Sequence, residues 1–249
     1  IWEQYNGTDP HNEDTDGDML ADGLECEWTE DGVTNIPWFT IQPFLTYVPT
    51  DNVDRALIGC AMPFATRLAG FSVDVALADV NGVVYFGRSD TTNGVSSSDG
   101  GADLSIAQSK HCATVAAYWT DLRMYQAQGS SITFGTAMLD ATNRFFVVQY
   151  LNVGTYSGGG NSISLQISIP ENQPDLVYVR YGTIVDTRSN GYVSIGAQGA
   201  KVSGFASRPC FNYLYQSGPP TIDAGRTVAF HFGAGSDPCE ADTDADGLD

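Results

Sequence analysis

Short apolar runs with a repeat of two residues constrain the fold more than any other feature of this chain. The clearest run alternates four aliphatic side chains with three polar ones: Ile163, Ser164, Leu165, Gln166, Ile167, Ser168 and Ile169. Successive side chains of a β-strand point to opposite faces, whereas an α-helix repeats every 3.6 residues. This run therefore predicts a strand with one face in an apolar core and the other face in solvent.

Other segments show the same alternation or are apolar throughout. The alternation occurs twice more, at Val73, Val75 and Leu77 and at Val228, Phe230 and Phe232. In the second of these segments it places His231 on an outward, solvated face. The denser runs at 145–148 and 176–179 predict strands that are covered on both faces.

Turn signals separate these runs. Asn-Gly pairs at 81–82 and 190–191 predict two-residue hairpins, in which both central residues take positive φ. The Gly-rich stretch 156–161 is typical of a surface loop that tolerates sequence change, and 26–37 is typical of a polar connector. Short strands with turns at this spacing predict an all-β fold, a single antiparallel β-sandwich over residues 32–236.

A twelve-residue acidic motif begins at Asp14. Its carboxylates occupy positions 1, 3, 5, 9 and 12 of a calcium loop: Asp14, Asp16, Asp18, Asp22 and Glu25. Position 7, which offers its backbone carbonyl to the ion, is Leu20, and position 6, usually a glycine that makes a sharp turn, is Met19. Carboxylates this close repel one another unless a cation lies between them. The motif therefore predicts bound Ca²⁺, a hard cation that accepts many oxygen ligands.

The same motif restarts near the other end of the chain, with the expected Gly247 at position 6. Its positions 1, 3, 5 and 7 are Asp242, Asp244, Asp246 and Leu248. A solvated acidic tail is the alternative interpretation of such charge runs. A tail of that kind has no reason to repeat its register, so the repetition favours the calcium loop.

Both ends resemble thrombospondin type-3 repeats, because Gly7-Thr8-Asp9-Pro10 leads directly into the first loop. The resemblance covers residues 1–25 and 237–249. It implies that calcium has a structural role there and that Asp9 is an additional ligand. Residues 1–31 and 237–249 are accordingly predicted to be irregular calcium-binding segments that flank the sandwich.

The two ends also suggest how copies of the chain could be joined. If one residue bridged Asp249 to Ile1 of a next copy, Glu3 would occupy position 12 of the second loop, the bidentate carboxylate. Two calcium loops in tandem would then link neighbouring sandwiches, and such a head-to-tail contact propagates into a filament. The alternative is that the segments continue into neighbouring repeats of a longer chain.

The acidity of the chain belongs to these end segments. Seventeen of the thirty acidic residues lie in 1–31 and 237–249, whereas all eleven Lys and Arg residues lie between them. No basic stripe is present to neutralise phosphates, so nucleic acid is not an expected partner. No apolar run has the length of a membrane span. Calcium loops of this kind remain loaded only where free calcium is high, which predicts an extracellular or cell-surface location.

Five cysteines are widely spaced: Cys26, Cys60, Cys112, Cys210 and Cys239. None forms a Cys-x-x-Cys pair, so disulfides or buried thiols are expected rather than a zinc site. Five is an odd number, so one thiol is free or pairs outside this chain. Cys26 and Cys239 lie at the junctions with the acidic segments and are candidates for clamps there. The single N-glycosylation sequon begins at Asn6.

A second resemblance concerns the central region. It is carried by the succession of the segments 80–87, 115–122, 132–135, 143–150 and 176–181. This succession resembles the nidogen-type extracellular domain and its bacterial relatives, over roughly residues 40 to 200. The resemblance implies a non-catalytic β module of matrix and surface proteins and carries over no catalytic residues.

Catalytic motifs are missing from the sequence. There is no Gly-x-Ser-x-Gly elbow, no His-Glu-x-x-His and no phosphate loop. Asp121 could form a glycosidase carboxylate pair with Asp140 or Asp186. A surface Asp at a strand end is a far more common role, so we expect no enzyme activity.

These observations favour an extracellular structural module, a β-sandwich joined by calcium-stiffened linkers in a surface array or filament. The expected partners are head-to-tail copies of the chain or neighbouring repeats. The alternative is an adhesin or carbohydrate-binding module on a calcium-dependent stalk. In that case some of the four Trp and twelve Tyr residues would form an exposed platform for glycans.

Overall fold

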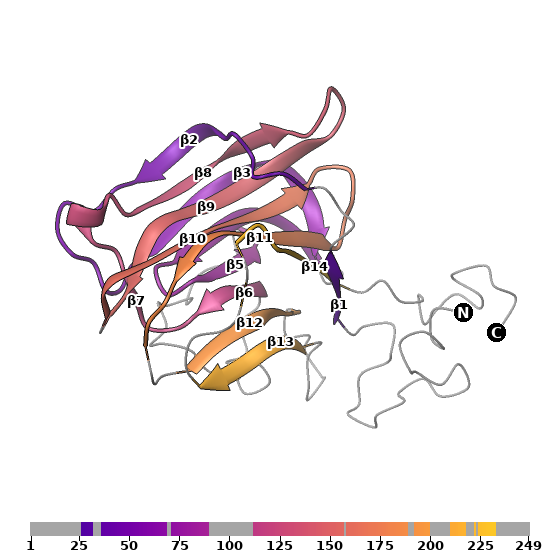
Figure 1. The fold of residues 1–249 in the computed structure, drawn as a ribbon. Helices are drawn as coiled ribbons and strands as arrows, with labels where there is room; N and C mark the ends of the chain where they lie inside the picture. Colours follow the sequence, from indigo (N-terminus) through magenta and orange to yellow (C-terminus); the bar gives the residue numbers. More distant parts are fainter. Residues whose placement is uncertain are drawn as a thin grey trace, which may run out of the picture.

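The computed structural model describes residues 26–31, 36–68, 71–89, 112–156, 158–188, 192–199, 210–217, 222 and 224–232 of the chain. These residues form two antiparallel sheets that pack face to face (Figure 1). The prediction of an antiparallel β-sandwich is confirmed. None of the described residues belongs to a helix long and apolar enough to cross a membrane.

The larger sheet has eight strands in the order β1-β14-β11-β10-β9-β8-β2, with the short strand β7 paired to β9. Their bounds are β1 Cys26–Asp31, β14 Thr227–Phe232, β11 Leu176–Val185, β10 Gly158–Pro170, β9 Arg144–Thr155, β8 Ser131–Met138, β2 Gln42–Tyr47 and β7 Leu122–Arg123. A short 3₁₀ helix, η2 (Gln126–Gln128), lies between β7 and β8.

The smaller sheet has six strands in the order β13-β12-β6-β5-β4-β3. Their bounds are β13 Cys210–Ser217, β12 Tyr192–Gln198, β6 Ala113–Trp119, β5 Val83–Gly87, β4 Phe71–Asp79 and β3 Leu57–Leu68. The core between the two sheets contains the aliphatic residues of β10 and the three apolar residues of β14 that the alternation predicted. The runs in β9 and β11 are buried on both faces, as expected.

The outer face of the larger sheet is covered by the chain itself, which corrects the prediction for β10. Ser164, Gln166 and Ser168 were expected in solvent, but they are only 6%, 1% and 2% exposed. Residues 36–41 lie over this face and form a second apolar cluster with four strands of the sheet. Its buried members are Ile36, Phe39, Ala137, Phe145, Val147, Leu176, Tyr178 and Ala229. Alternation cannot distinguish a face in water from a face that another segment of the chain covers, so the prediction of a solvated face was wrong.

The topology of the larger sheet explains why residues 36–41 cross its outer face. β1 and β2 lie at opposite edges of the larger sheet although they are close in sequence, so the chain between them has to pass over the sheet. Gln166 on the central strand β10 fixes the described part of this crossing. Its amide accepts a hydrogen bond from the Phe39 N–H at 2.8 Å and donates one to the Phe39 carbonyl at 2.9 Å. A side chain therefore pairs with the crossing segment as a strand would.

β4 departs from the predicted alternation because of an irregularity in its pairing with β3. The register shifts between Ala61 and Thr66, where β3 carries extra residues. Such a bulge moves later side chains to the opposite face. Val73 lies in the main core, but Leu77 packs against a cluster on the other face of the smaller sheet. The prediction that both share one face was wrong.

The first Asn-Gly hairpin exists, but its geometry differs from the prediction. Asp79 pairs with Val83, so the loop has three residues, and of these only Gly82 has positive φ, at 81°. The Gly82 N–H donates to the Asp79 carbonyl at 3.1 Å. This is a turn followed by a left-handed glycine rather than a two-residue turn.

The second Asn-Gly pair lies outside the described residues, and the strands on either side of it, β11 and β12, do not pair with each other. β11 pairs with β10 and β14 in the larger sheet, whereas β12 pairs with β6 and β13 in the smaller one. The chain therefore changes sheets between these strands.

Two further predictions concern segments near the sheet edges. Residues 26–31 were predicted as connector and instead form β1, which pairs with β14 along its whole length. The sheet thus begins inside the segment assigned to the calcium linker. His231 lies on the outer face as predicted, but it is half-buried, and burial lowers its pKa from the ordinary value.

Candidate functional site

All the residues predicted to bind calcium lie outside the described residues: Glu3, Asp9, Asp14, Asp16, Asp18, Leu20, Asp22, Glu25, Asp242, Asp244, Asp246 and Leu248. The calcium loops therefore remain predictions. Within the described ranges, no group of three or more His, Cys, Asp or Glu side chains could hold a metal ion. Cys60 carries a free, half-buried thiol, and burial raises its pKa.

The carboxylates weighed as a glycosidase pair are separated by the fold. The Asp121 carbonyl accepts a hydrogen bond from Tyr156, just after β9 ends. Asp140 lies before β9 begins, where its carboxylate accepts bonds from the main-chain N–H groups of Thr142 and Asn143 at 2.8 and 3.0 Å. These bonds, together with hydrogen bonds from the Asn143 side-chain amide and the Thr142 hydroxyl, lower the pKa of Asp140 to about 2. β9 extends for 12 residues between the two sites, or roughly 35 Å, so Asp121 and Asp140 cannot act on one bond.

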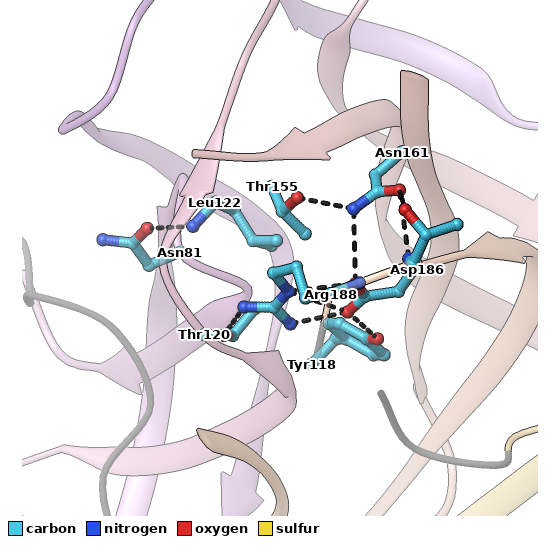
Figure 2. A network of polar contacts seen from close by, with 9 residues as sticks. Asn81, Tyr118, Thr120, Leu122, Thr155, Asn161, Asp186 and Arg188 are labelled. Atoms are coloured by element: carbon cyan, nitrogen blue, oxygen red, sulfur yellow. Dashed lines mark hydrogen bonds and ion pairs between the residues drawn. The ribbon is translucent and has the colours of Figure 1, made fainter. Parts of the chain in front are cut away.

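Asp186, the other proposed partner, is part of a buried polar network at one end of the sandwich (Figure 2). Arg188 Nε lies 2.9 and 3.1 Å from the two carboxylate oxygens of Asp186, and its Nη2 approaches Oδ2 at 2.5 Å. The side chains of Asp186 and Arg188 are only 1% and 7% exposed. An Arg and an Asp buried together in this way remain charged because each compensates the other.

Two more residues complete the shell around this ion pair. Tyr118 Oη donates to Asp186 Oδ2 at 2.8 Å, and Arg188 Nη1 donates to Thr120 Oγ1 at 2.6 Å. Burial opposes the charge on Asp186, but the hydrogen bonds from Arg188 and Tyr118 outweigh it and lower the pKa of this carboxyl. Burial and the neighbouring carboxylate raise the pKa of Tyr118. The tyrosine is therefore a hydrogen-bond donor at neutral pH.

Asn161 connects the ion pair to the larger sheet (Figure 2). Its amide nitrogen donates to Thr155 Oγ1 at 2.7 Å and to Asp186 Oδ1 at 3.3 Å, and its oxygen accepts from the Thr187 N–H at 3.1 Å. The side chain is 1% exposed. The sequence placed Asn161 in a tolerant surface loop, which is wrong, because it lies in β10 and uses both ends of its amide.

The β4–β5 turn closes the same end of the sandwich from the smaller sheet. Asn81 Oδ1 accepts a hydrogen bond from the Leu122 N–H at 2.8 Å, and the Gly82 carbonyl accepts from Ala117 at 3.0 Å. A Cβ atom at Gly82 would lie 2.3 Å from the Tyr118 carbonyl oxygen, so no other residue fits without movement. The network thereby joins elements of both sheets at this end.

A cationic side chain lies close to two aromatic rings on the outside of this end. Arg123 Cζ is 5.3 Å from the ring centroid of Tyr156 and 5.7 Å from that of Tyr125. Its neighbours in the chain, Leu122 and Met124, are buried in the core, so the alternation of the strand directs Arg123 outward. Sequence reasoning missed this group because residues far apart in the chain supply its two rings.

Comparisons with known proteins identify the central region. No curated protein and no solved structure matches the chain. The family model described as NIDO related matches residues 39–224, a span that contains most of both sheets and all the residues of the buried network. The resemblance drawn from residues 40 to 200 is therefore confirmed and extended. The chain belongs to the NIDO related family.

Proposed function

We propose that this protein is an extracellular structural module, in which the β-sandwich is carried on calcium-binding segments within a surface array or filament. The observation that carries the proposal is the pairing of β1 with β14. Cys26 lies opposite Phe232, and the ladder continues to Asp31 opposite Thr227. Paired Cα atoms of an antiparallel ladder are about 5 Å apart. The chain therefore reaches the sandwich and leaves it at neighbouring points on one edge of the larger sheet.

This geometry suits a sandwich that projects sideways from its carrier. The acidic motif at 14–25 ends one residue before Cys26, and the second motif starts ten residues after Phe232. Both motifs are therefore connected to the same edge by short stretches of chain. A carrier built from them would continue past the sandwich, with each sandwich as a side branch. The predicted head-to-tail joining of copies is compatible with this arrangement, because head-to-tail joining requires only that both flanking segments be free to contact the segments of neighbouring copies.

Calcium is assigned to the flanking segments on the strength of their carboxylate spacing and mutual repulsion. The sandwich has its own apolar core between the sheets, which is formed by residues of the described part of the chain. Calcium removal should therefore loosen the flanking segments and leave the sandwich folded. This separation of roles is what the experiment has to test.

The test combines limited proteolysis with electron microscopy, in millimolar calcium and in chelator. Residues 9–25 should resist cleavage only with calcium, and regular assemblies should form with calcium and fragment in chelator. Asp16→Ala, which removes one charged ligand, should shift both effects to higher calcium. Asp51→Ala, at an exposed site within the sandwich, is the matched control and should behave as wild type. Equal protection of 9–25 in both conditions, or discrete monomers at millimolar calcium, would contradict the proposal.

A further inference from the structure

Arg123 differs from three other arginines of the sandwich in having no carboxylate partner. Arg67, Arg144 and Arg188 each form an ion pair with a carboxylate. The Arg123 side chain forms no ion pair or hydrogen bond with any part of the chain that the structure describes, and its Nε is a buried donor without a partner there. The guanidinium is held instead by the faces of Tyr125 and Tyr156. The Nε is closed to solvent, but the two Nη groups are not among the buried atoms without a partner. A guanidinium kept in place without a counter-ion therefore has its Nη groups available to a ligand.

One of the two aromatic rings beside Arg123, that of Tyr125, is fixed before any ligand arrives. Tyr125 Oη donates to the main-chain carbonyls of Thr155 and Tyr156 at 3.0 and 3.1 Å. The Tyr125 ring lies against Gly154, where a Cβ atom would come within 2.7 Å of a ring carbon. Thr155 in turn accepts a hydrogen bond from Asn161 and so belongs to the buried network. A site supported in this way loses little conformational entropy on binding.

The chemistry of the group indicates its ligand. Tyr156 is 49% exposed and presents an aromatic surface next to the cation. A guanidinium recognises a carboxylate through two parallel hydrogen bonds, and an aromatic face packs well against the apolar face of a sugar ring. The sandwich between the acidic ends carries a net charge of only about −2, so it does not repel a single carboxylate strongly. One arginine matches one such group but not the closely spaced phosphates of a nucleic acid.

We propose that Arg123, Tyr125 and Tyr156 bind the uronate residues of an acidic polysaccharide, with Arg123 on the carboxylate and the exposed part of Tyr156 against the sugar ring. The inference is independent of the proposed calcium-dependent assembly. It concerns only described residues of the sandwich, and it requires no metal ion. Failure of one proposal therefore leaves the other intact.

The probe for this site is a hexamer of galacturonic acid, followed by calorimetry and by chemical shifts of the protein in chelator. The chelator matters because calcium could bridge the hexamer to the acidic segments. The methyl-esterified hexamer keeps the sugar rings but lacks the charge, and it should bind roughly tenfold or more weakly. Shift changes should centre on residues 121–128 and 154–156.

Three variants test the roles of the side chains. Arg123→Gln should reduce binding at least tenfold, and Arg123→Lys should restore only part of it, because an ammonium group lacks the planar fork. Tyr156→Ala should reduce binding about tenfold as well. Tyr192→Ala is the matched control, since Tyr192 is 50% exposed but lies in the smaller sheet, and it should bind as wild type.

Several results would overturn the assignment. The site does not exist if the wild-type protein fails to bind the hexamer in chelator or binds its methyl ester equally well. The same holds if Arg123→Gln binds as wild type, or if Tyr192→Ala and Tyr156→Ala lose affinity to the same extent. If the Arg123 and Tyr156 variants lower the thermal midpoint while their folded fraction still binds the hexamer, the aromatic stack has only a structural role.

Discussion

The side-chain amide of Gln166 pairs with the main chain of Phe39 through two hydrogen bonds of 2.8 and 2.9 Å, across 127 positions of sequence. Gln166 also donates to Gln149 Oε1 at 2.7 Å. A single side chain on the central strand β10 thus anchors the segment that covers the outer face of the larger sheet. Without it, the Phe39 N–H and carbonyl would be buried with no partner.

Replacement of Gln166 by Ala should therefore destabilise the protein by about 2–3 kcal/mol, because it leaves two buried main-chain groups unsatisfied. Urea unfolding measures this loss. Gln149→Ala removes only one side-chain bond and leaves the pairing with Phe39 intact, so its cost should be about 1 kcal/mol. Equal losses for the two variants would mean that the amide pairing does not anchor the covering segment.

The buried pair of Asp186 and Arg188 should be sensitive to the loss of either partner. Asp186→Asn leaves the buried charge of Arg188 without its partner, and Arg188→Met leaves that of Asp186 without its partner. Each variant should lower the free energy of unfolding by about 3–5 kcal/mol. The double variant should lose clearly less than the sum of the two single losses. A double-mutant cycle by urea unfolding gives the coupling energy, expected to be about 1.5 kcal/mol or more. Additive losses would show that the pair contributes no mutual stabilisation.

The lowered pKa of Asp186 leads us to expect that the protein loses stability in acid. The pKa of Asp186 is lower in the folded protein than the value of about 3.9 in an unfolded chain. Its contribution is therefore fully present above pH 4 and is lost as the pH falls through the lower, folded value. The free energy of unfolding, measured from pH 6 to pH 3, should decline more steeply for the wild type than for Asp186→Asn. Parallel curves would refute this assignment.

Two glycines with positive φ allow the cost of backbone strain alone to be compared with the cost of strain plus a steric clash. Gly82→Ala adds a Cβ atom 2.3 Å from the Tyr118 carbonyl, whereas a Cβ at Gly129 meets nothing within 4 Å. Gly129→Ala should cost about 1 kcal/mol for its left-handed conformation. Gly82→Ala should cost about 3 kcal/mol or more, because the β4–β5 turn must also withdraw from β6. Thermal unfolding of both variants provides the comparison.

The sequence predicted the sheets better than it predicted what covers them. Period-two alternation found the core face of β10 and β14 because side-chain direction in a strand is a local property. It could not show that Ser164 and Ser168 are buried, since the covering residues 36–41 are more than 120 positions away. The pairing shift between β3 and β4 was likewise hidden, because register is decided between strands.

The polar end of the sandwich was beyond local reasoning for the same reason. Asp186 was considered for its acidity, but its partners come from β6, β10 and the residues after β11. Asn161 follows a run of glycines, and that composition suggested a loop. The one usable signal was Asn81-Gly82, which correctly indicated a turn, although its role in closing this end required the contact with β6.

The pairing of β1 with β14 also decides how the protein would respond to a pull. Tension transmitted through both flanking segments would act on Cys26 and Phe232, which lie side by side at one end of the ladder. Such a force peels β1 from β14 starting at this end, so the hydrogen bonds of the ladder break one after another rather than all at once. The main core stays out of the line of force until β1 has been removed. The outermost strand would therefore yield first, which lengthens the carrier while the rest of the sandwich remains folded.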